Sequence, residues 1–190
     1  MELLRQRISQ EGKILGHGIL KVDSLINHQV DPELMNACGL EFANLFAGIK
    51  ATRILTAEIS GIAPALMAGL HLHIPVVYAR KSRPVTMPDT VYLTIAPSHT
   101  KGNMVELIVS PEYLKPHEKV LIIDDFLASG ATIQGLVRLT QAAGAQVVGI
   151  GTMVEKTFEG GRDSLSYLGV PIESLVKISS LDNDTITFVD

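Results

Sequence analysis

One stretch, residues 120–132, limits the possible folds more than any other part of the chain. It begins with four consecutive apolar residues, 120–123, and three of these four are β-branched. A short apolar run of this kind predicts a strand that is buried on both faces, which is typical of a parallel sheet. From Ala131 onward the chain is rich in apolar residues with few breakers, which predicts a helix. A buried strand that runs through a turn into a helix indicates an α/β fold.

Two acidic residues and a loop of small residues lie between the predicted strand and helix. Asp124 and Asp125 follow the apolar run, at the sheet edge where open α/β proteins bind ligands. The small-residue loop, as we call it, consists of Ala128, Ser129, Gly130, Ala131 and Thr132. Because these side chains have little bulk, backbone N–H groups can approach a phosphate at the helix N-terminus. The stretch therefore predicts a site for a phosphorylated sugar, with the acids accepting hydrogen bonds from hydroxyls directly or through a metal's water. The alternative is a plain strand–turn–helix junction whose acids only cap the helix.

Length and composition indicate one α/β domain, over residues 1–190. The 190 residues, 46% of them hydrophobic, suffice for a single buried core, and the net charge of −4 without a basic tract gives no support for nucleic-acid binding. The single cysteine, Cys38, cannot form an internal disulfide, which favours the cytoplasm. The start of the chain is charged and does not resemble a signal peptide. Residues 54–79 are apolar but interrupted by prolines and Glu58, so we expect no membrane span.

The pattern of apolar residues, caps and breakers predicts the other elements. Asp31 followed by Pro32 indicates the start of a helix whose buried side carries Leu34, Cys38, Phe42, Leu45 and Phe46 and which ends at Gly48. The remaining expectations are a helix at 1–12, an irregular loop at 13–27, a strand at 54–57, a helix at 62–72, strands at 76–79 and 147–154, a β-hairpin flap within 84–104 with its tip at 98–103, a helix at 162–168, a strand at 175–178 and an edge strand at 185–190.

Two further segments follow predicted strands and could bind an anion. The turn Glu58, Ile59, Ser60 and Gly61 offers backbone amides at a strand end, although an ordinary turn is the alternative. Residues 80–83 contain three basic side chains, Lys81 among them, which could neutralise a pyrophosphate or form a solvated turn. Since parallel strands end at one edge of the sheet, these segments and the small-residue loop can converge on one ligand. We expect that ligand to carry a phosphate for the small-residue loop, a diol for the two acids and a pyrophosphate for the other two segments. Phosphoribosyl pyrophosphate (PRPP) has these three groups.

The sequence also resembles a known family. Residues 122–132 are similar to the PRPP signature of the type I phosphoribosyltransferases, and no Walker A loop or G-x-G-x-x-G motif occurs in the chain. Residues 11–29, 57–63 and 78–81 extend the resemblance, over essentially the whole chain, to the bacterial xanthine phosphoribosyltransferases. The resemblance implies a type I phosphoribosyltransferase fold: a central parallel sheet flanked by helices, a small hood from residues 1–30 and part of the C-terminal region, and a flexible hairpin flap that closes over the site. It also implies a non-proline cis peptide bond in the 58–61 turn.

This resemblance implies an enzyme of purine salvage that transfers the phosphoribosyl group of PRPP to xanthine, giving xanthosine 5′-monophosphate and pyrophosphate. It implies a homodimer and Mg²⁺ bound together with PRPP. Asp124, Asp125 and Lys81 are the implied catalytic residues, and residues 58–61 and 128–132 the implied PRPP-binding segments. The base would be bound by Leu20, Asn27 and Lys156.

Side-chain chemistry alone leaves the base open. Lys156 follows the predicted strand 147–154 and can donate to the 6-oxo group of a purine, which disfavours adenine; a lysine extended along the surface is the alternative. The amide of Asn27 can donate or accept, so xanthine, guanine and hypoxanthine all remain possible. A PRPP-binding regulator without catalysis is the alternative of another class. It would carry a DNA-binding domain, for which 190 residues leave no obvious room.

Overall fold

A sheet of six strands forms the centre of the computed structural model, which describes residues 1–16, 18–97, 104–182 and 185–189. Its strand order is β10-β9-β8-β7-β3-β4, and neighbouring strands are parallel except for β10, which is antiparallel to β9. The strands are β3 (Arg53–Ala57), β4 (Val76–Ala79), β7 (Lys119–Leu127), β8 (Gln146–Lys156), β9 (Ile172–Asp182) and β10 (Thr185–Phe188). The predicted parallel α/β sheet is thereby confirmed.

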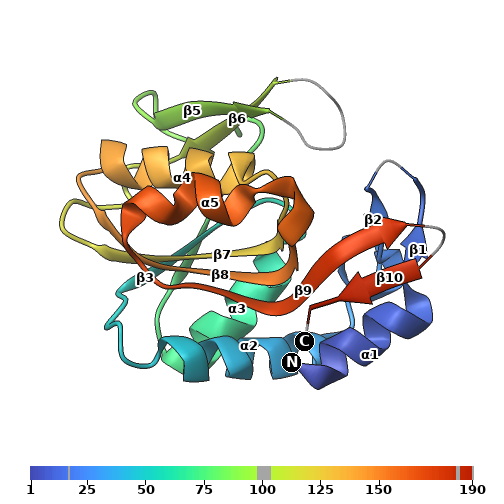
Figure 1. Ribbon diagram of the computed structural model, residues 1–190. Helices are drawn as coiled ribbons and strands as arrows, with labels where there is room; N and C mark the ends of the chain where they lie inside the picture. The colour runs from blue at the N-terminus through green and yellow to red at the C-terminus, as the bar shows by residue number, and fades with distance from the viewer. Residues whose placement is uncertain (17, 98–103, 183–184, 190) are drawn as a thin grey trace.

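Helices cover both faces of this sheet (Figure 1). On one side are α2 (Pro32–Phe46) and α3 (Ile62–Leu72), and on the other are α4 (Ala131–Ala142) and α5 (Gly161–Leu165). A smaller group of elements gathers at one end of the sheet: α1 (Glu2–Glu11), β1 (Lys13–Ile14), β2 (Leu20–Lys21) and the π-helical turn η1 (Asp23–Asn27). Two 3₁₀ turns, η2 (Thr157–Glu159) and η3 (Ser166–Leu168), flank α5.

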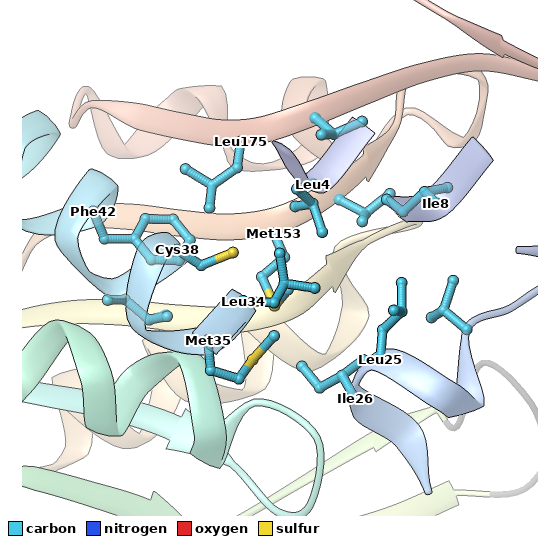
Figure 2. Close-up of a cluster of buried hydrophobic side chains, with 14 of the residues drawn as sticks. Leu4, Ile8, Leu25, Ile26, Leu34, Met35, Cys38, Phe42, Met153 and Leu175 are labelled. Atoms are coloured by element: carbon cyan, nitrogen blue, oxygen red, sulfur yellow. The ribbon is translucent and has the colours of Figure 1, made fainter. Parts of the chain in front are cut away.

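The smaller group shares a core with the sheet. Figure 2 shows Leu4 and Ile8 of α1 and Leu25 of η1 in the same cluster as Phe42 of α2 and Met153 of β8. These five side chains are at most 2% exposed. Burying one such side chain contributes about 1.5–3 kcal/mol. The N-terminal segment is therefore packed against the body of the domain and carries its residues to the same sheet edge as β8.

Helix α2 begins as predicted. The carboxylate of Asp31 accepts a hydrogen bond from the backbone N–H of Leu34 at 3.0 Å, and Pro32 occupies the first turn. The helix ends at Phe46 rather than at Gly48. Leu45, expected on the buried side, is 44% exposed, because its position in the last turn faces away from the sheet.

Strand β7 is longer than predicted and includes both acids. It continues to Leu127 because β8 runs beside it, pairing Asp124 with Thr152 and Phe126 with Val154. Polar residues do not end a strand whose neighbour still offers hydrogen-bond partners. Asp124 and Asp125 are thus the sixth and seventh of the nine residues of β7 and do not lie in the loop that follows.

Other boundaries also differ from the expectations. The segment 13–27 is not an irregular loop, since it contains the antiparallel pair β1–β2 and the turn η1. The hairpin consists of β5 (Tyr92–Pro97) and β6 (Met104–Val109), so it reaches past residue 104; its expected tip, 98–103, lies outside the described residues. Arg138 of α4 donates to the hydroxyl of Thr94 at 2.9 Å, which docks the hairpin on α4. Within the described ranges, no helix is long and apolar enough to cross a membrane.

Candidate active site

A pocket of about 380 Å³ opens where the parallel strands β3, β7 and β8 end. Most of the predicted site residues line it, although they come from distant parts of the sequence. They are Leu20, Asn27, Ser60, Lys81, Asp124, Asp125, Ala128, Ser129, Gly130, Ala131, Thr132 and Lys156. Of the 58–61 turn, Ser60 is the residue in the lining; Ile59 is 78% exposed, and the side chain of Glu58 turns elsewhere, as described below.

The small-residue loop joins β7 to α4. Gly130 has φ +83°, in the left-handed region that side chains rarely adopt, and α4 begins at the next residue. The loop therefore carries backbone N–H groups of the first helical turn to the pocket, where no bulky side chain covers them. Such an arrangement favours a phosphate.

The acid pair lies beside this loop. Asp124 is 4% exposed, and Asp125 accepts a hydrogen bond from the N–H of Phe126 at 2.9 Å. Burial raises the pKa of both carboxyl groups, and the neighbouring charge of Asp125 raises the pKa of Asp124 further. A bound cation, or hydroxyl groups donating to the carboxylates, would stabilise their ionised form.

Gly61 approaches the acid pair so closely that a side chain here would displace its neighbours. A Cβ at this position would lie 2.4 Å from Oδ1 of Asp124 and 2.2 Å from Oγ1 of Thr56. The turn 58–61 is consequently in direct contact with β7, and the peptide bond between Glu58 and Ile59 is cis, as the resemblance implied.

Glu58 connects two of the predicted segments. Its carboxylate accepts a hydrogen bond from the backbone N–H of Lys81 at 2.5 Å, and it lies 3.8 Å from Nε of Arg80. Of the three basic residues in 80–83, Lys81 lines the pocket, whereas Arg80 approaches Glu58 and Arg83 pairs with Asp89 at 3.2 Å. Glu58 therefore holds the position of Lys81 through the backbone.

Lys156 lies at the other end of the pocket. Its side chain is 5% exposed, so a lysine extended along the surface is excluded. Nζ donates to the carbonyl of Gly18 at 2.7 Å, lies 3.2 Å from a carboxylate oxygen of Glu159, and is 5.7 Å from the centre of the Phe126 ring. The lysine thus joins β8 to the N-terminal segment that carries Leu20 and Asn27.

Several lining residues were not predicted as site residues. One of them is Phe126, which directly follows the acid pair. Its position beside Asp125 was the one sequence signal that could have indicated a place in the pocket. The others are Ile19, Ala96, Pro97, Val105, Leu107 and Ile133. The hairpin residues in this group reach the pocket because β5 packs on α4. No local sequence pattern predicts that contact between distant segments.

Comparison with known proteins identifies the family. The family model described as a phosphoribosyl transferase domain matches residues 59–188. The xanthine phosphoribosyltransferase of Leuconostoc mesenteroides is 48% identical over 189 residues, which cover 100% of both chains. This chain belongs to the xanthine phosphoribosyltransferase family. The same name is carried by a relative from Moorella thermoacetica, 48% identical over 190 residues, with 100% of this chain and 97% of the relative covered.

Solved structures confirm the type I phosphoribosyltransferase fold. The adenine phosphoribosyltransferase of Thermoanaerobacter pseudethanolicus superposes with a TM-score of 0.76 at 24% identity, covering 92% of this chain and 99% of that one. The enzyme from Giardia lamblia in complex with 9-deazaadenine gives a TM-score of 0.77 at 19% identity, covering 93% and 98%. At these identities the likeness extends to the fold alone. The predicted family, fold and enzyme class of this xanthine phosphoribosyltransferase family member are confirmed.

Proposed function

We propose that this chain transfers the 5-phosphoribosyl group of PRPP to xanthine and releases xanthosine 5′-monophosphate and pyrophosphate, a reaction of purine salvage. The observation that carries the proposal is a single pocket lined by the acid pair, the small-residue loop and the buried Lys156. Full-length similarity to xanthine phosphoribosyltransferases supports the choice of base.

In this proposal the small-residue loop binds the 5′-phosphate through backbone N–H groups. Asp124 and Asp125 accept hydrogen bonds from the two ribose hydroxyls. Displacement of pyrophosphate by a ring nitrogen gives the ribose oxocarbenium character, and a carboxylate pair next to the sugar stabilises that positive charge. No nucleophilic side chain is needed, because the attacking group belongs to the base.

The pyrophosphate would lie between Ser60 and Lys81. Ser60 lines the pocket from the 58–61 turn, and Lys81 lines it from the basic segment, held there by Glu58. We propose that the backbone amides of Ile59, Ser60 and Gly61 and the ammonium of Lys81 balance the charge of the leaving group.

Mg²⁺ fits the residues at the centre of this pocket. The described residues include no cluster of three potential metal ligands, but Asp124 and Asp125 supply carboxylate oxygens. Burial disfavours the ionised form of these two carboxylates, and a nearby cation would favour it. Such a pair suits Mg²⁺, which commonly uses one or two carboxylates together with substrate phosphates and water. We propose that the acids hold it through water. When bound, Mg²⁺ would act as a Lewis acid that assists pyrophosphate departure.

At the base end, Lys156 would donate to the 6-oxo group of xanthine, and Asn27 would hydrogen bond to the 2-oxo group. Leu20 is buried and would provide an apolar wall. A cation at this place favours a base with partial negative charge and disfavours the amino group of adenine.

The proposal extends to the assembly and its setting. We propose a homodimer in the cytoplasm, where the free, buried thiol of Cys38 stays reduced. We further propose that residues 1–30 and part of the C-terminal region act as a hood over the base, and that the hairpin segment 84–104 acts as a flap. Light scattering of the purified protein tests the dimer.

Pyrophosphate release from PRPP and Mg²⁺ tests the function, with xanthine, guanine, hypoxanthine and adenine supplied in turn. The highest kcat/KM with xanthine is the expected result. A highest value with guanine or hypoxanthine would make the chain a transferase for that base. PRPP binding without release for any base would replace the proposal by a regulator that binds PRPP.

A further inference from the structure

Helix α5 lies directly against the back of the small-residue loop. A Cβ at Gly161 would lie 2.2 Å from the carbonyl oxygen of Ala128 and 2.9 Å from the backbone N of Gly130. In the opposite direction, a Cβ at Gly130 would lie 2.8 Å from Oγ of Ser164, which itself lies 3.4 Å from the carbonyl of Ser129. With so little space between the two backbones, a shift of α5 must move the loop.

A three-residue clamp fixes α5 to the sheet. Arg162 donates from Nε and Nη2 to the two carboxylate oxygens of Glu155, at 2.8 Å and 2.6 Å, and from Nη1 to the carbonyl of Ile172 at 2.8 Å. Ser174 of β9 donates to Oε2 of Glu155 at 2.6 Å. We call Arg162, Glu155 and Ser174 the α5 clamp; it joins the helix to β8 and β9.

The clamp is ionised and has a fixed geometry. The Glu155 side chain is 3% exposed, and burial alone would raise its pKa, but the hydrogen bonds from Arg162 and Ser174 bring that pKa below its ordinary value. The cost of removing both charges from water offsets much of the electrostatic attraction between Arg162 and Glu155. The main effect of the pair is therefore on the orientation of α5 rather than on the free energy of unfolding. A bidentate guanidinium–carboxylate pair fixes both distance and direction.

The clamp also borders the base end of the pocket. Glu155 immediately precedes Lys156 on β8, and successive side chains on a strand point to opposite faces. Glu155 therefore faces α5 while Lys156 faces the pocket. A change in the clamp would displace the end of β8 that carries Lys156 as well as the loop.

We propose that Arg162 and Gly161 are positioning residues of this enzyme. Gly161 allows α5 to support the small-residue loop in the geometry that binds the 5′-phosphate. Arg162 fixes α5 and the end of β8 relative to each other, so that phosphate and base are bound at a set separation. This inference rests on the proposed function, because it assigns the phosphate to the loop and the base to Lys156.

Two variants and a matched control test it. Arg162→Lys keeps a cation for Glu155 but removes the bidentate geometry, and Gly161→Ala places a methyl group against the loop backbone. Arg53→Lys is the control, since Arg53 forms a similar pair with Glu118, 2.5 Å apart and with side chains 19% and 15% exposed, at the amino-terminal end of the parallel strands. For each protein, kcat, KM for PRPP and KM for xanthine are measured, with PRPP affinity by calorimetry in Mg²⁺ and the melting temperature.

Both site variants should raise KM and Kd for PRPP by about tenfold or more, with kcat at saturation reduced far less, because small displacements of a binding group weaken positioning. Arg162→Lys should also raise KM for xanthine, whereas Gly161→Ala should not. Arg53→Lys should change the melting temperature without changing either KM.

A folded Gly161→Ala protein with wild-type KM and Kd for PRPP would overturn the inference, as would equal effects of Arg162→Lys and Arg53→Lys on KM. If Arg162→Lys does not fold, Gly161→Ala decides alone. Wild-type protein that neither binds PRPP nor releases pyrophosphate would refute the proposed function itself, and this inference with it. Normal wild-type turnover beside unaltered variants refutes the inference only.

Discussion

Lys156→Met tests the origin of base selectivity most directly. The methionine side chain is apolar and of similar length, so it fills the space against Phe126 that the lysine stem occupies, while the ammonium group is lost. What disappears is the hydrogen bond to the Gly18 carbonyl at 2.7 Å, the pair with Glu159 at 3.2 Å, and the proposed bond to the 6-oxo group.

The magnitude follows from the charge of the donor. A hydrogen bond to a charged group contributes about 1.5–3 kcal/mol, which corresponds to roughly 10- to 150-fold in binding. We expect KM for xanthine to rise within that range. The value of kcat should change little, because Lys156 lies at the base end of the pocket and away from the acid pair. Loss of a partner for the Gly18 carbonyl costs about 1–3 kcal/mol of folding stability, which thermal unfolding would report separately.

The assay is steady-state pyrophosphate release with each purine at saturating PRPP. Lys119→Met is the matched control: it removes the same charge from the exposed first residue of β7, at the far end of that strand. Besides the change in KM, the preference for xanthine over adenine should shrink, since the repelling ammonium is gone. An unchanged KM for xanthine in a folded Lys156→Met protein would refute the role of this lysine.

Two further predictions concern the acid pair and the hairpin. Burial raises the pKa of Asp124 and Asp125 in the folded protein. At a pH between the ordinary aspartate pKa of about 4 and these raised pKa values, the folded protein therefore binds more protons than the unfolded chain. The unliganded protein should therefore lose stability as pH rises through that window. The double variant Asp124→Asn/Asp125→Asn should not show this loss of stability, and its turnover should fall by orders of magnitude. Thermal unfolding across pH measures the first effect, and pyrophosphate release measures the second. Near-normal turnover would contradict the proposed role of the acids. If the segment 84–104 closes over bound PRPP, its cleavage by protease should slow when PRPP and Mg²⁺ are added, and equal cleavage rates would reject a flap.

Much of the fold could be predicted because its signals are local. The apolar run before Asp124, the Asp31–Pro32 start of α2 and the apolar run at 76–79 are each a local signal, and the structure has a strand or a helix at each of these places. Their order along the chain then placed the candidate loops at one edge of a parallel sheet.

The ends of the strands could not be predicted in the same way. β7 runs through the acid pair because β8 supplies partners as far as Glu155, and β9 extends from Ile172 to Asp182 on the other side of β8. Pairing between distant segments, rather than the polarity of residues within a strand, decides such ends. For the same reason the α5 clamp, which joins Glu155, Arg162 and Ser174, has no signature in the sequence.

Among the described residues, two buried side-chain atoms have no hydrogen-bond partner, and both lie at the ligand edge of the sheet: Oγ1 of Thr56, near the end of β3, and Nε of Arg80, directly after β4. Oγ1 of Thr56 and Oδ1 of Asp124 lie within 2.4 Å of one point, the place where a Gly61 Cβ would stand. A buried polar atom without a partner costs about 1–3 kcal/mol, and the raised pKa of Asp124 is a second cost at the same place. The fold tolerates both because the core in Figure 2, on the α2 side of the sheet, contributes stability that offsets them. A ligand that donates to Asp124 and brings positive charge to the acid pair would remove part of this cost, so some of its binding free energy comes from relieving the unliganded site.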